Sequence, residues 1–429
     1  MTAEKLHHLF LKSSQVCTDS RTISKDCMFF ALKGDNFNGN LFAKEALNKG
    51  AKYAIVDENI DVEKENIIKV NDVLKSLQSL ATYHRIKLGI PVIALTGSNG
   101  KTTTKELINC ILSTTYNTSA TQGNFNNHIG VPLTLLNFNS NTEIGIIEMG
   151  ANHQKEIEFL CEIALPDIGL ITNFGKAHLE GFGGFEGVIK GKTELYSHLK
   201  ANEKPIVTNL DDKLQVKQLA NYKNTIAFSA SQSKNVLEII QTEQSNNFVT
   251  LKYLDTLINS NLIGNYNFTN LAYSITIGHH YKVDKEDIKK AIQSYVPKNN
   301  RSQIIKKNSN SIILDAYNAN PTSMKAALDN LKNNSSNSKF AILGDMFELG
   351  DDAKKEHQYI AEYAEKNTKV STILVGENFY TSKLSKPESL KFKQFSDLVY
   401  YLDKNPIKKS TILIKGSRGM ALERLLDII

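Results

Sequence analysis

Short apolar runs alternate with longer amphipathic segments along nearly the whole chain. Apolar runs of three to five residues, bounded by turn residues, predict buried strands, and apolar positions three and four residues apart predict helices. The order of these segments divides the chain into three regions, and we expect each region to form an α/β domain. The expected domains comprise residues 1–88, 89–297 and 298–429.

The first two regions differ in how regularly strands and helices alternate. In the first, strands are predicted at residues 28–32 and 53–56, and helices at 42–49 and 73–88. The second opens at a Gly-Ile-Pro boundary and follows a βαβ order, which predicts a parallel sheet. Its predicted strands are 92–95, 144–147 and 168–171, its predicted helices are 101–112, 153–163 and 268–277, and short polar strands are predicted between 235 and 257.

The third region follows a linker-like run at residues 297–300 and repeats the alternation. Its strands are predicted at 312–314, 341–343, 373–375 and 412–414, and its helices at 323–331, 354–364 and 420–426. This order predicts a second doubly wound, Rossmann-like unit.

Composition excludes several classes of protein. The 429 residues are 41% hydrophobic and 22% charged, which is typical of a globular rather than a disordered chain. Lys and Arg exceed Asp and Glu by 51 − 45 = 6 without any long basic run, so we expect no nucleic-acid partner. No stretch approaches the ~20 apolar residues of a membrane helix. We therefore expect no membrane insertion. The 4 cysteines lack metal-ligand spacing, so we expect neither a zinc site nor a disulfide framework, and a location in the reducing cytoplasm.

Residues 97–103 carry the clearest chemical signal. They read Gly-Ser-Asn-Gly-Lys-Thr-Thr between a predicted strand and a predicted helix. There, glycines let backbone N–H groups turn toward a polyphosphate, and the helix N-terminus adds favourable partial charge. Leu95 replaces the first glycine of the full phosphate-loop pattern, so the alternative is a glycine-rich turn with an exposed lysine. The nucleotide-binding residues predicted here are Gly97, Ser98, Asn99, Gly100, Lys101, Thr102 and Thr103. We therefore expect the central domain to be a parallel-sheet ATPase with a phosphate loop.

Two candidate metal ligands follow later strands of the same sheet. Glu148 ends one strand, and a carboxylate beside a phosphate loop can hold Mg²⁺ directly or through water, together with the Thr102 hydroxyl. The alternative is a solvated carboxylate. His178 lies just past the next strand, although Mg²⁺ prefers oxygen ligands and spacing alone favours a structural histidine. The glycine-rich run 181–191 predicts a mobile segment, either a plain loop or a lid.

These residues resemble those of the Mur ligases, the ATP-dependent amide-forming enzymes of peptidoglycan synthesis, over essentially the whole chain. By that resemblance Glu148 and His178 are magnesium residues. Gly-Lys-Thr-Glu-Leu-Tyr at 191–196 is similar to the family segment that carries a carbamylated lysine, here Lys192. A carbamate turns an ammonium into an anionic oxygen ligand, and its formation needs a neutral amine, hence a lowered pKa. The implied catalytic residues are Lys101, Glu148, His178 and Lys192.

Three segments of the third region are similar to the family member that adds D-alanyl-D-alanine to UDP-N-acetylmuramoyl-tripeptide. They are Asp-Ala-Tyr-Asn-Ala-Asn-Pro-Thr-Ser-Met at 315–324, Leu-Gly-Asp-Met-Phe-Glu-Leu-Gly at 343–350 and Lys-Gly-Ser-Arg at 415–418. Each alone could be a turn at a helix start, but their joint occurrence in order argues against coincidence. The resemblance makes Asp315 an ATP contact and places Asn318, Asn320 and Arg418 around the dipeptide.

Other segments imply the remaining contacts. Residues 123–134 resemble the loop that contacts the muramoyl peptide, with an Asn-rich turn as the alternative, and residues 19–21 resemble part of the uridine site, with a solvated loop as the alternative. The contacts implied are Asn124, Asn126 and Asn127 for the muramoyl peptide, Ser20 and Arg21 for uridine, and Asn267, Asn270 and Arg301 for ATP.

Two family patterns are altered in this chain. Tyr266 stands where the family has His in Gly-x-His-Asn-x-x-Asn, while the two asparagines of that pattern are kept. Asn38-Gly39-Asn40 stands where the family has Asp-Gly-His near the uridine site.

The resemblance implies a two-step reaction with ATP and Mg²⁺. The terminal carboxylate of the tripeptide attacks the γ-phosphate and becomes an acyl phosphate, whose carbonyl carbon is then attacked by the amine of D-alanyl-D-alanine. The UDP end, ATP and the dipeptide are expected in the first, second and third domains, so the site is complete only when the domains close. We expect a monomer. The sequence leaves open whether the third tripeptide residue is L-Lys or diaminopimelate, and whether Lys192 is carbamylated.

Other functions remain open from the sequence. A Mur-type ligase that adds a single amino acid, or a ligase that adds glutamates to folate, would share most of these residues but not the segment at 315–321. A nucleotide-driven switch would hydrolyse its nucleotide without forming an amide, although the chain lacks the Asn-Lys-x-Asp guanine signature. A sugar-nucleotide binder without activity would leave Lys101 without a purpose.

Overall fold

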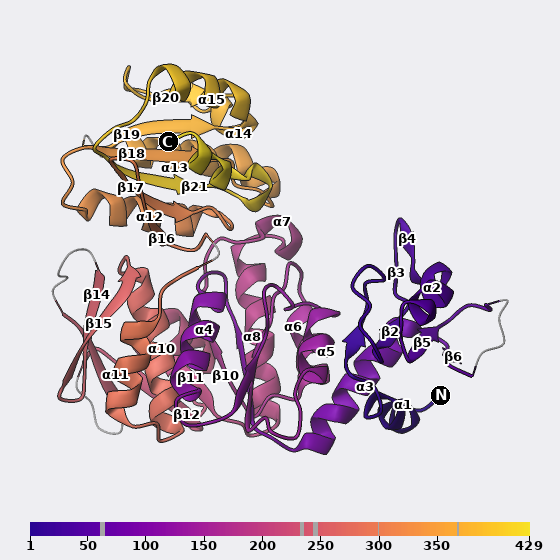
Figure 1. Cartoon of the computed structure of the whole chain (residues 1–429). Coiled ribbons are helices and arrows are strands. Elements are labelled where there is room, and N and C mark those ends of the chain that lie inside the picture. The colour runs from indigo at the N-terminus through magenta and orange to yellow at the C-terminus, as the bar shows by residue number, and fades with distance from the viewer. Residues whose placement is uncertain (61–64, 232–235, 243–247, 299, 367–368) are drawn as a thin grey trace.

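Three α/β units, each built around its own sheet, make up the molecule (Figure 1). The computed structural model describes residues 1–429 except 61–64, 232–235, 243–247, 299 and 367–368. The C-terminal unit lies above the central unit in Figure 1, and the N-terminal unit lies beside it. This arrangement confirms the expected fold class. Residue 299 of the predicted linker, and residues 235 and 243–247 of the predicted polar strands, lie outside the described residues.

The N-terminal unit holds a four-stranded parallel sheet of order β1-β2-β5-β6 and a small β3–β4 hairpin. Its elements are α1 (Ala3–Phe10), β1 (Val16–Cys17), β2 (Met28–Phe30), β3 (Lys33–Gly34), β4 (Phe37–Asn38), η1 (Gly39–Phe42), α2 (Ala43–Asn48), β5 (Tyr53–Val56), β6 (Ile67–Lys69) and α3 (Val73–Leu88). Helix α3 starts at Asp72, whose side chain caps it, and ends at the left-handed Gly89. It packs against α1, and also against α5 (Gly130–Leu136) and α6 (Glu156–Ala164) of the central unit.

The central unit holds a nine-stranded sheet of order β15-β14-β13-β12-β11-β10-β7-β9-β8, which is parallel except at β13–β15. Its elements are β7 (Val92–Thr96), α4 (Lys101–Leu112), β8 (Thr118–Ala120), α5 (Gly130–Leu136), β9 (Ile144–Glu148), α6 (Glu156–Ala164), β10 (Ile168–Ile171), α7 (Leu179–Phe182), α8 (Phe185–Ala201), β11 (Ile206–Asn209), α9 (Lys213–Leu219), β12 (Thr225–Ser229), β13 (Leu237–Gln241), β14 (Phe248–Tyr253), β15 (Thr256–Ile263), α10 (Tyr266–His280) and α11 (Lys285–Ser294). Strand β7 pairs with both β9 and β10, so the carboxyl ends of the three strands meet at one edge. The phosphate loop follows β7 at that edge.

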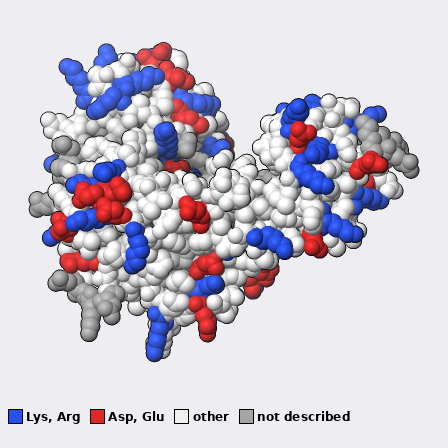
Figure 2. All heavy atoms as spheres, turned by 60° about the horizontal axis from the view of Figure 1, so that its bottom comes forward, with Lys and Arg blue, Asp and Glu red and all other residues white. Residues whose placement is uncertain are grey.

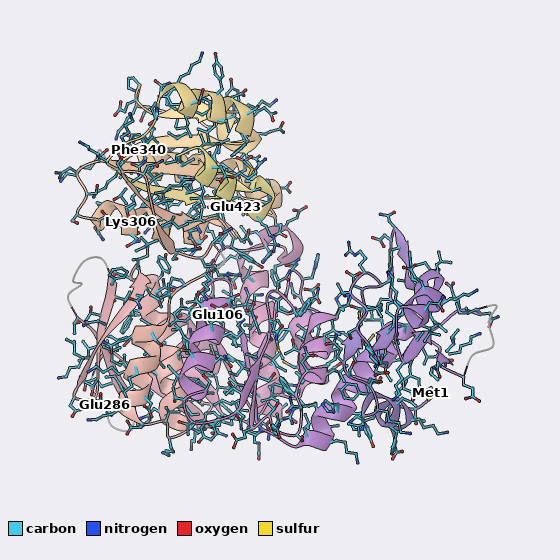
Figure 3. The ribbon with its side chains drawn as sticks, in the orientation of Figure 1. Met1, Glu106, Glu286, Lys306, Phe340 and Glu423 are labelled. Carbon is cyan, nitrogen blue, oxygen red and sulfur yellow. The ribbon has the colours of Figure 1, made fainter. Side chains whose placement is uncertain are left out.

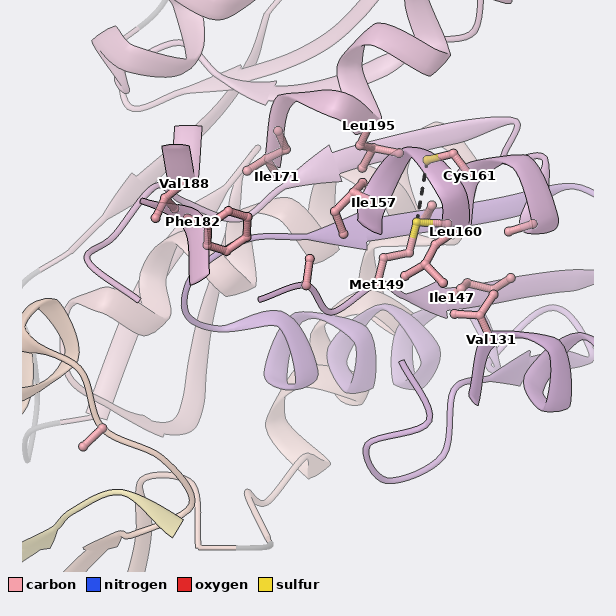
Figure 4. Packing of buried hydrophobic residues seen from close by; sticks show 14 of the residues in the cluster. Val131, Ile147, Met149, Ile157, Leu160, Cys161, Ile171, Phe182, Val188 and Leu195 are labelled. Atoms are coloured by element: carbon pink, nitrogen blue, oxygen red, sulfur yellow. Dashed lines mark hydrogen bonds between the residues drawn. The ribbon is translucent and has the colours of Figure 1, made fainter. Parts of the chain in front are cut away.

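A buried core supports this edge from one side of the sheet (Figure 4). Met149, directly after β9, packs with Ile157 and Leu160 of α6 and with Leu195 of α8. The sulfur atoms of Met149 and Cys161 lie 3.8 Å apart within this cluster. Because Met149 is packed in this way, the neighbouring Glu148 is held in a fixed position at the strand end.

The glycine-rich run at 181–191 is mostly helical, so the alternative of a plain loop is wrong. Gly183 and Gly184 have positive φ angles of 72° and 100° and separate α7 from α8. A Cβ atom at Gly187 would lie 1.8 Å from the Phe182 carbonyl oxygen, and one at Gly191 would lie 2.4 Å from the Phe182 ring. At these two positions, glycine allows close packing of α8 against α7.

The C-terminal unit holds a six-stranded sheet of order β16-β17-β21-β18-β19-β20, parallel except for β16. Its elements are β16 (Gln303–Lys307), β17 (Asn310–Asp315), α12 (Pro321–Asn333), β18 (Lys339–Gly344), η2 (Gly350–Asp352), α13 (Ala353–Glu365), β19 (Ser371–Val375), α14 (Glu377–Thr381), β20 (Leu390–Phe392), α15 (Phe395–Lys404), β21 (Thr411–Lys415), η3 (Arg418–Met420) and η4 (Leu422–Asp427). The last strand in the sequence, β21, lies in the interior of the sheet between β17 and β18.

Two predicted helices differ from the structure. The segment 420–426 forms two 3₁₀ turns instead of one α-helix, because Ala421 adopts a left-handed conformation with φ 47° between them. Its apolar spacing reflects the burial of Leu422 and Leu425. The helix predicted from residue 153 begins at Glu156, since Lys155 has φ 72°.

The surface in Figure 2 carries charges of both signs, interspersed rather than gathered into one continuous basic area. In Figure 3, Met1 marks the N-terminal unit, Glu106 and Glu286 the central unit, and Lys306, Phe340 and Glu423 the C-terminal unit. Within the described part of the chain, no helix is both long and apolar enough to cross a membrane.

Candidate active site

A cavity of about 1210 Å³ lies between the central and C-terminal units. The predicted site residues that line it are Ser98, Asn99, Gly100, Lys101, Thr102, Thr103, Asn124, Asn126, Asn127, Glu148, His178, Asn267, Asn270, Arg301, Asp315, Asn318, Asn320 and Arg418. Gly97 and Lys192 are not among the lining residues, and Ser20 and Arg21 belong to the separate N-terminal unit. The structure thus brings together residues that are up to 320 positions apart in the sequence.

The phosphate loop is held closely by neighbouring elements. A Cβ atom at Gly97, where φ is 146°, would lie 2.0 Å from the Thr172 hydroxyl, and one at Gly100 would lie 2.4 Å from Asn270 Oδ1. The Thr172 hydroxyl donates to the Asn99 carbonyl oxygen at 2.6 Å, and the Asn99 amide donates to Asn173 Oδ1 at 3.1 Å. The loop is therefore shaped by the end of β10 and by α10 before any ligand binds.

Lys101 is the first residue of α4 and points back over the loop. Its Nζ donates to the Gly97 carbonyl oxygen at 2.8 Å. Burial lowers the pKa of Lys101, the nearby Glu148 carboxylate opposes that shift, and the charge of Arg301 adds to it. The ammonium thus lies in a cavity with other cations, which favours binding of a polyanion.

Glu148 has one satisfied and one unsatisfied carboxylate oxygen. The side chain is 2% exposed, and its Oε1 accepts a hydrogen bond of 2.8 Å from Asn126 Nδ2. Its Oε2 is buried and has no hydrogen-bond partner among the described residues. A buried carboxylate oxygen without a donor is costly, and a bound cation with oxygen ligands would satisfy it.

Few other acidic or imidazole side chains lie close enough to Glu148 to bind the same cation. Among the described residues, no three or more His, Cys, Asp or Glu side chains gather in a way that could hold a metal ion. A cation beside Glu148 would therefore need oxygens of another kind, such as the Thr102 hydroxyl, a lysine carbamate, phosphate or water. The donor set at Glu148 fits Mg²⁺ better than a softer metal.

Lys192 lies on α8 with 1% of its surface exposed. Its Nζ donates to the Ala151 carbonyl oxygen at 3.1 Å and lies 4.9 Å from the centroid of the Phe182 ring. Burial, followed by the charge of Lys101, lowers the pKa of Lys192 well below its ordinary value. A neutral amine is the form that can accept CO₂ as a carbamate, so the surroundings of Lys192 fit that modification.

His178 lies at a contact between the two units. Its Nδ1 is 2.6 Å from Oε2 of Glu348, which comes from the C-terminal unit. The interaction with His178 lowers the pKa of the Glu348 carboxyl. The sequence indicated His178 but not Glu348, although Glu348 lies inside the recognised segment at 343–350.

Further contacts connect the phosphate-loop edge to the C-terminal unit. Asn320 Nδ2 donates to Asn99 Oδ1 at 2.7 Å, and Asn99 Nδ2 donates in return at 3.5 Å. The backbone N–H of Lys176 donates to the Thr322 hydroxyl at 3.0 Å, and its side chain forms an ion pair with the buried Glu356. No motif pointed to Lys176 or Glu356, because their roles depend on how two separate units pack.

A polar network links α10 to the start of the C-terminal unit. Asn270 accepts from the Thr104 hydroxyl at 3.2 Å and donates to Asn267 Oδ1 at 2.8 Å. The hydroxyls of Tyr266 and Ser302 lie 2.7 Å apart, and burial raises the pKa of Tyr266. The tyrosine that replaces the family histidine therefore joins the two units.

Asp315, the predicted ATP contact, is already paired on both oxygens. The backbone N–H of Ser302 donates to Oδ1 at 3.1 Å, and the buried Lys415 donates to Oδ2 at 2.6 Å. Lys415 belongs to the segment 415–418 that resembles the family, but the resemblance implies no role for it. Its position opposite Asp315 follows from the pairing of β17 with β21.

The uridine candidates lie apart from this cavity. Arg21 forms an exposed ion pair of 2.7 Å with Asp19, and the Ser20 carbonyl oxygen accepts from Lys49 Nζ at 3.1 Å. In the altered Asn-Gly-Asn pattern, Asn40 is buried and donates to Asp57 Oδ1 at 2.9 Å.

Family models match three parts of the chain. Residues 12–85 match the Mur ligase family catalytic domain, residues 95–278 the Mur ligase middle domain, and residues 300–418 the Mur ligase glutamate ligase domain. Together these matches extend over most of all three units.

Relatives of known name match nearly the full length. The UDP-N-acetylmuramoyl-tripeptide--D-alanyl-D-alanine ligase of Bacillus subtilis (strain 168) is 34% identical, with 96% of this chain and 93% of that protein covered. The ligase of the same name from Escherichia coli (strain K12) is 32% identical, with 96% and 92% covered.

Solved structures of MurF enzymes are similar to this chain over nearly its full length. MurF from Acinetobacter baumannii is 29% identical with a TM-score of 0.86, and 99% of this chain and 98% of that chain are covered. The MurF ligase from Thermotoga maritima, solved in complex with ADP, is 28% identical with a TM-score of 0.82, and 98% and 97% are covered.

Proposed function

The chain belongs to the Mur ligase family, and on that premise we propose that it joins D-alanyl-D-alanine to UDP-N-acetylmuramoyl-tripeptide, forming ADP and phosphate, in peptidoglycan precursor synthesis. The observation that carries this proposal is the shared cavity. Asp315, Asn318 and Arg418, which come from the segments similar to the D-alanyl-D-alanine-adding member, line the same cavity as the phosphate loop.

In the activation step, the terminal carboxylate of the tripeptide attacks the γ-phosphorus of ATP, and ADP leaves. The product is an acyl phosphate. Lys101 and the backbone N–H groups of residues 97–103 neutralise charge on the transferred phosphoryl group, which is the main task of the protein in such chemistry. Arg301, Asn267 and Asn270 bind the nucleotide, while Asn124, Asn126 and Asn127 orient the muramoyl peptide.

A Mg²⁺ ion would be held by the Glu148 carboxylate, the Thr102 hydroxyl, His178 and Lys192 in its carbamate form. When bound, the ion supplies further neutralisation of phosphate charge. Support comes from the unpartnered Oε2 of Glu148 and the lowered pKa of Lys192.

In the second step, the amine of D-alanyl-D-alanine attacks the acyl carbon, phosphate leaves and the amine loses a proton. Asn318, Asn320 and Arg418 surround the dipeptide, and Arg418 offers a guanidinium to its carboxylate. The acyl phosphate must be protected from water, and contact between the central and C-terminal units serves this purpose.

The expected domains 1–88, 89–297 and 298–429 would then divide the substrates. The first binds the UDP end through Ser20 and Arg21, the second binds ATP and the third binds the dipeptide. We further propose that the enzyme works as a monomer in the cytoplasm.

The test is product analysis with purified protein. ADP release should require both the muramoyl tripeptide and D-alanyl-D-alanine, and mass spectrometry should detect the pentapeptide product. Tripeptides that end in L-Lys and in diaminopimelate, assayed side by side, would assign the acceptor. ADP release with a single amino acid in place of the dipeptide would refute the proposal. Lys101→Ala should abolish ligation without unfolding the protein.

A further inference from the structure

Two arginines share one aromatic ring in the cavity. The guanidinium carbon of Arg301 lies 3.6 Å from the centroid of the Tyr317 ring, and that of Arg418 lies 5.3 Å from it. Tyr317 follows β17, Arg418 follows the paired strand β21, and Arg301 precedes β16. All three residues line the cavity, so three separate segments converge on this ring.

Neither arginine is neutralised by the protein. In the described part of the chain, no carboxylate lies within 4.0 Å of either guanidinium, whereas the neighbouring Lys415 is paired with Asp315. The Nε of Arg301 is also buried without a hydrogen-bond partner. Two like charges that share a small region repel each other, so something other than a counter-ion must hold them there.

The ring can do this because its face is negative. A guanidinium over the face of a tyrosine is attracted by the ring quadrupole without losing its positive charge. A carboxylate would hold the arginines more strongly, but it would also occupy the donors that an anionic ligand needs. The aromatic ring therefore orients both cations without placing a carboxylate on the N–H groups that an anionic ligand needs.

We propose that Tyr317 is a positioning residue that presents Arg301 to the nucleotide phosphates and Arg418 to the carboxylate of the dipeptide. This inference rests on the proposed function and extends it to a residue without a direct chemical role. The contact depends on the ring more than on the hydroxyl, because the hydrogen bond from Arg418 Nη1 to the Tyr317 hydroxyl is long, at 3.5 Å. The backbone N–H of Tyr317 also donates to the Asn300 carbonyl oxygen, and this bond survives replacement of the side chain.

The test compares Tyr317→Leu, which removes the ring, with Tyr317→Phe, which keeps it. For Tyr317→Leu the KM for ATP and the KM for D-alanyl-D-alanine should each rise about three- to tenfold, while the KM for the muramoyl substrate stays within about twofold. Tyr317→Phe should recover most of both losses. Tyr400→Leu is the matched control, since Lys404 lies 4.0 Å from the Tyr400 ring on the surface and all three KM values should stay unchanged.

Three outcomes would overturn the proposal. They are unchanged KM values in Tyr317→Leu, a rise confined to one of the two substrates, or a Tyr317→Phe variant as defective as Tyr317→Leu. A merely structural role would lower the melting temperature and kcat without this pattern. If Tyr317→Leu does not fold, Tyr317→Met fills a similar space and replaces it in the same comparison.

Calorimetric titration with ADP separates this inference from the proposed function. If the wild type forms no amide, the proposed function fails, but the Kd for ADP still tests the Arg301 half. Tyr317→Leu should then bind ADP about three- to tenfold more weakly than wild type and Tyr317→Phe nearly as well as wild type. Equal affinity of all three proteins would overturn it.

Discussion

Glu148 retains a buried carboxylate oxygen without a hydrogen-bond partner, and such an atom costs a fold about 1–3 kcal/mol. Its place at the end of a strand beside the phosphate loop could be predicted from the order of elements. The lack of a partner for one of its oxygens could not be predicted, because it depends on which oxygen the Asn126 amide, 22 residues away, contacts. Lys192 was likewise predicted only through the resemblance of residues 191–196 to the family. Its burial could not be predicted, because it depends on how α8 packs against the rest of the unit.

Removing the charge of Glu148 should separate stability from activity. We expect Glu148→Gln to lower kcat/KM for ligation about 100-fold, since a metal ligand is lost. In the absence of Mg²⁺ its melting temperature should equal or exceed that of the wild type, because a buried carboxylate oxygen without a hydrogen-bond partner is gone. A variant that keeps its activity but melts several degrees lower would show that Glu148 has a structural role instead.

Carbamylation of Lys192 should make the enzyme depend on dissolved CO₂. Burial lowers the pKa of Lys192 and so raises the share of neutral amine that can take up CO₂. Removal of CO₂ should therefore reduce the ligation rate, and added bicarbonate should restore it. Lys192→Arg cannot form the carbamate and should lose about 100-fold or more in kcat at any bicarbonate concentration. Equal rates with and without CO₂ in the wild type would contradict the assignment.

Elements with a strong apolar period were predicted well, and elements rich in glycine were not. Strands β7, β9 and β10 fall within a residue of their predicted ends, because a buried parallel strand needs an uninterrupted apolar run. Helix α8 was missed because its glycines suggest a loop, and only the position of Phe182 shows why they are needed. Local sequence does not contain the partner against which a glycine packs.

A methyl group at Gly191 should disturb the packing of α7 on α8. Its Cβ would lie 2.4 Å from the Phe182 ring, so Gly191→Ala should lower the free energy of unfolding by about 1–3 kcal/mol in urea denaturation. Gly34→Ala is the control, because no atom lies within 4 Å of a Cβ placed there. Equal destabilisation by both substitutions would count against close packing as the cause.

Helices α1 and α3 meet at a histidine pair that predicts a pH effect on stability. His84 Nε2 donates to the Phe138 carbonyl oxygen at 2.9 Å, so its Nδ1 accepts from His7 Nε2 at 3.0 Å. Burial lowers the pKa of both side chains, with the charges of His84, His8 and Lys87 adding to the effect at His7. Both rings are therefore neutral in the folded protein at neutral pH.

The sign of the effect follows from proton uptake. Because the unfolded chain binds more protons below about pH 6.5, stability is complete above that pH and falls as the pH decreases through it. Between about pH 7.5 and 5.5 the melting temperature of the wild type should fall more steeply than that of His7→Phe, which keeps the ring contacts but cannot be protonated. Parallel curves would exclude this pair as the source.

On the scale of the whole molecule, the segments that resemble the Mur ligases predicted many of the residues that share the cavity. They did not predict how the central and C-terminal units contact each other. Asn99 and Asn320 are 221 positions apart, and neither the phosphate-loop pattern nor the helix-start pattern indicates their amide pair. The contacts of Lys176 with Glu356 and of His178 with Glu348 are equally invisible in the sequence. Such pairings depend on the relative placement of two folded units.

Loss of the Asn99–Asn320 pair should favour separation of the units. Asn320→Ser keeps a good N-cap for α12 but is too short to reach Asn99. One lost hydrogen bond of about 1 kcal/mol shifts an open–closed equilibrium about fivefold, so small-angle scattering should give a larger radius of gyration than for the wild type. Asn318→Ser, at an exposed position, is the control and should have the same radius of gyration as the wild type. An unchanged radius for Asn320→Ser would argue that other contacts hold the units together.

The interior position of β21 in its sheet determines how late in translation the C-terminal unit can fold. Strands β17 and β18 leave the ribosome about a hundred and about seventy residues before β21 joins them, and until then each presents an unpaired edge. Lys415, the partner of Asp315, arrives with the same strand. A growing chain can thus fold its phosphate loop early, but no incomplete chain can assemble the C-terminal wall of the cavity. Premature termination after the central unit but before residue 411 would therefore yield a fragment that carries the phosphate loop, is prone to aggregate and has no means of forming an amide.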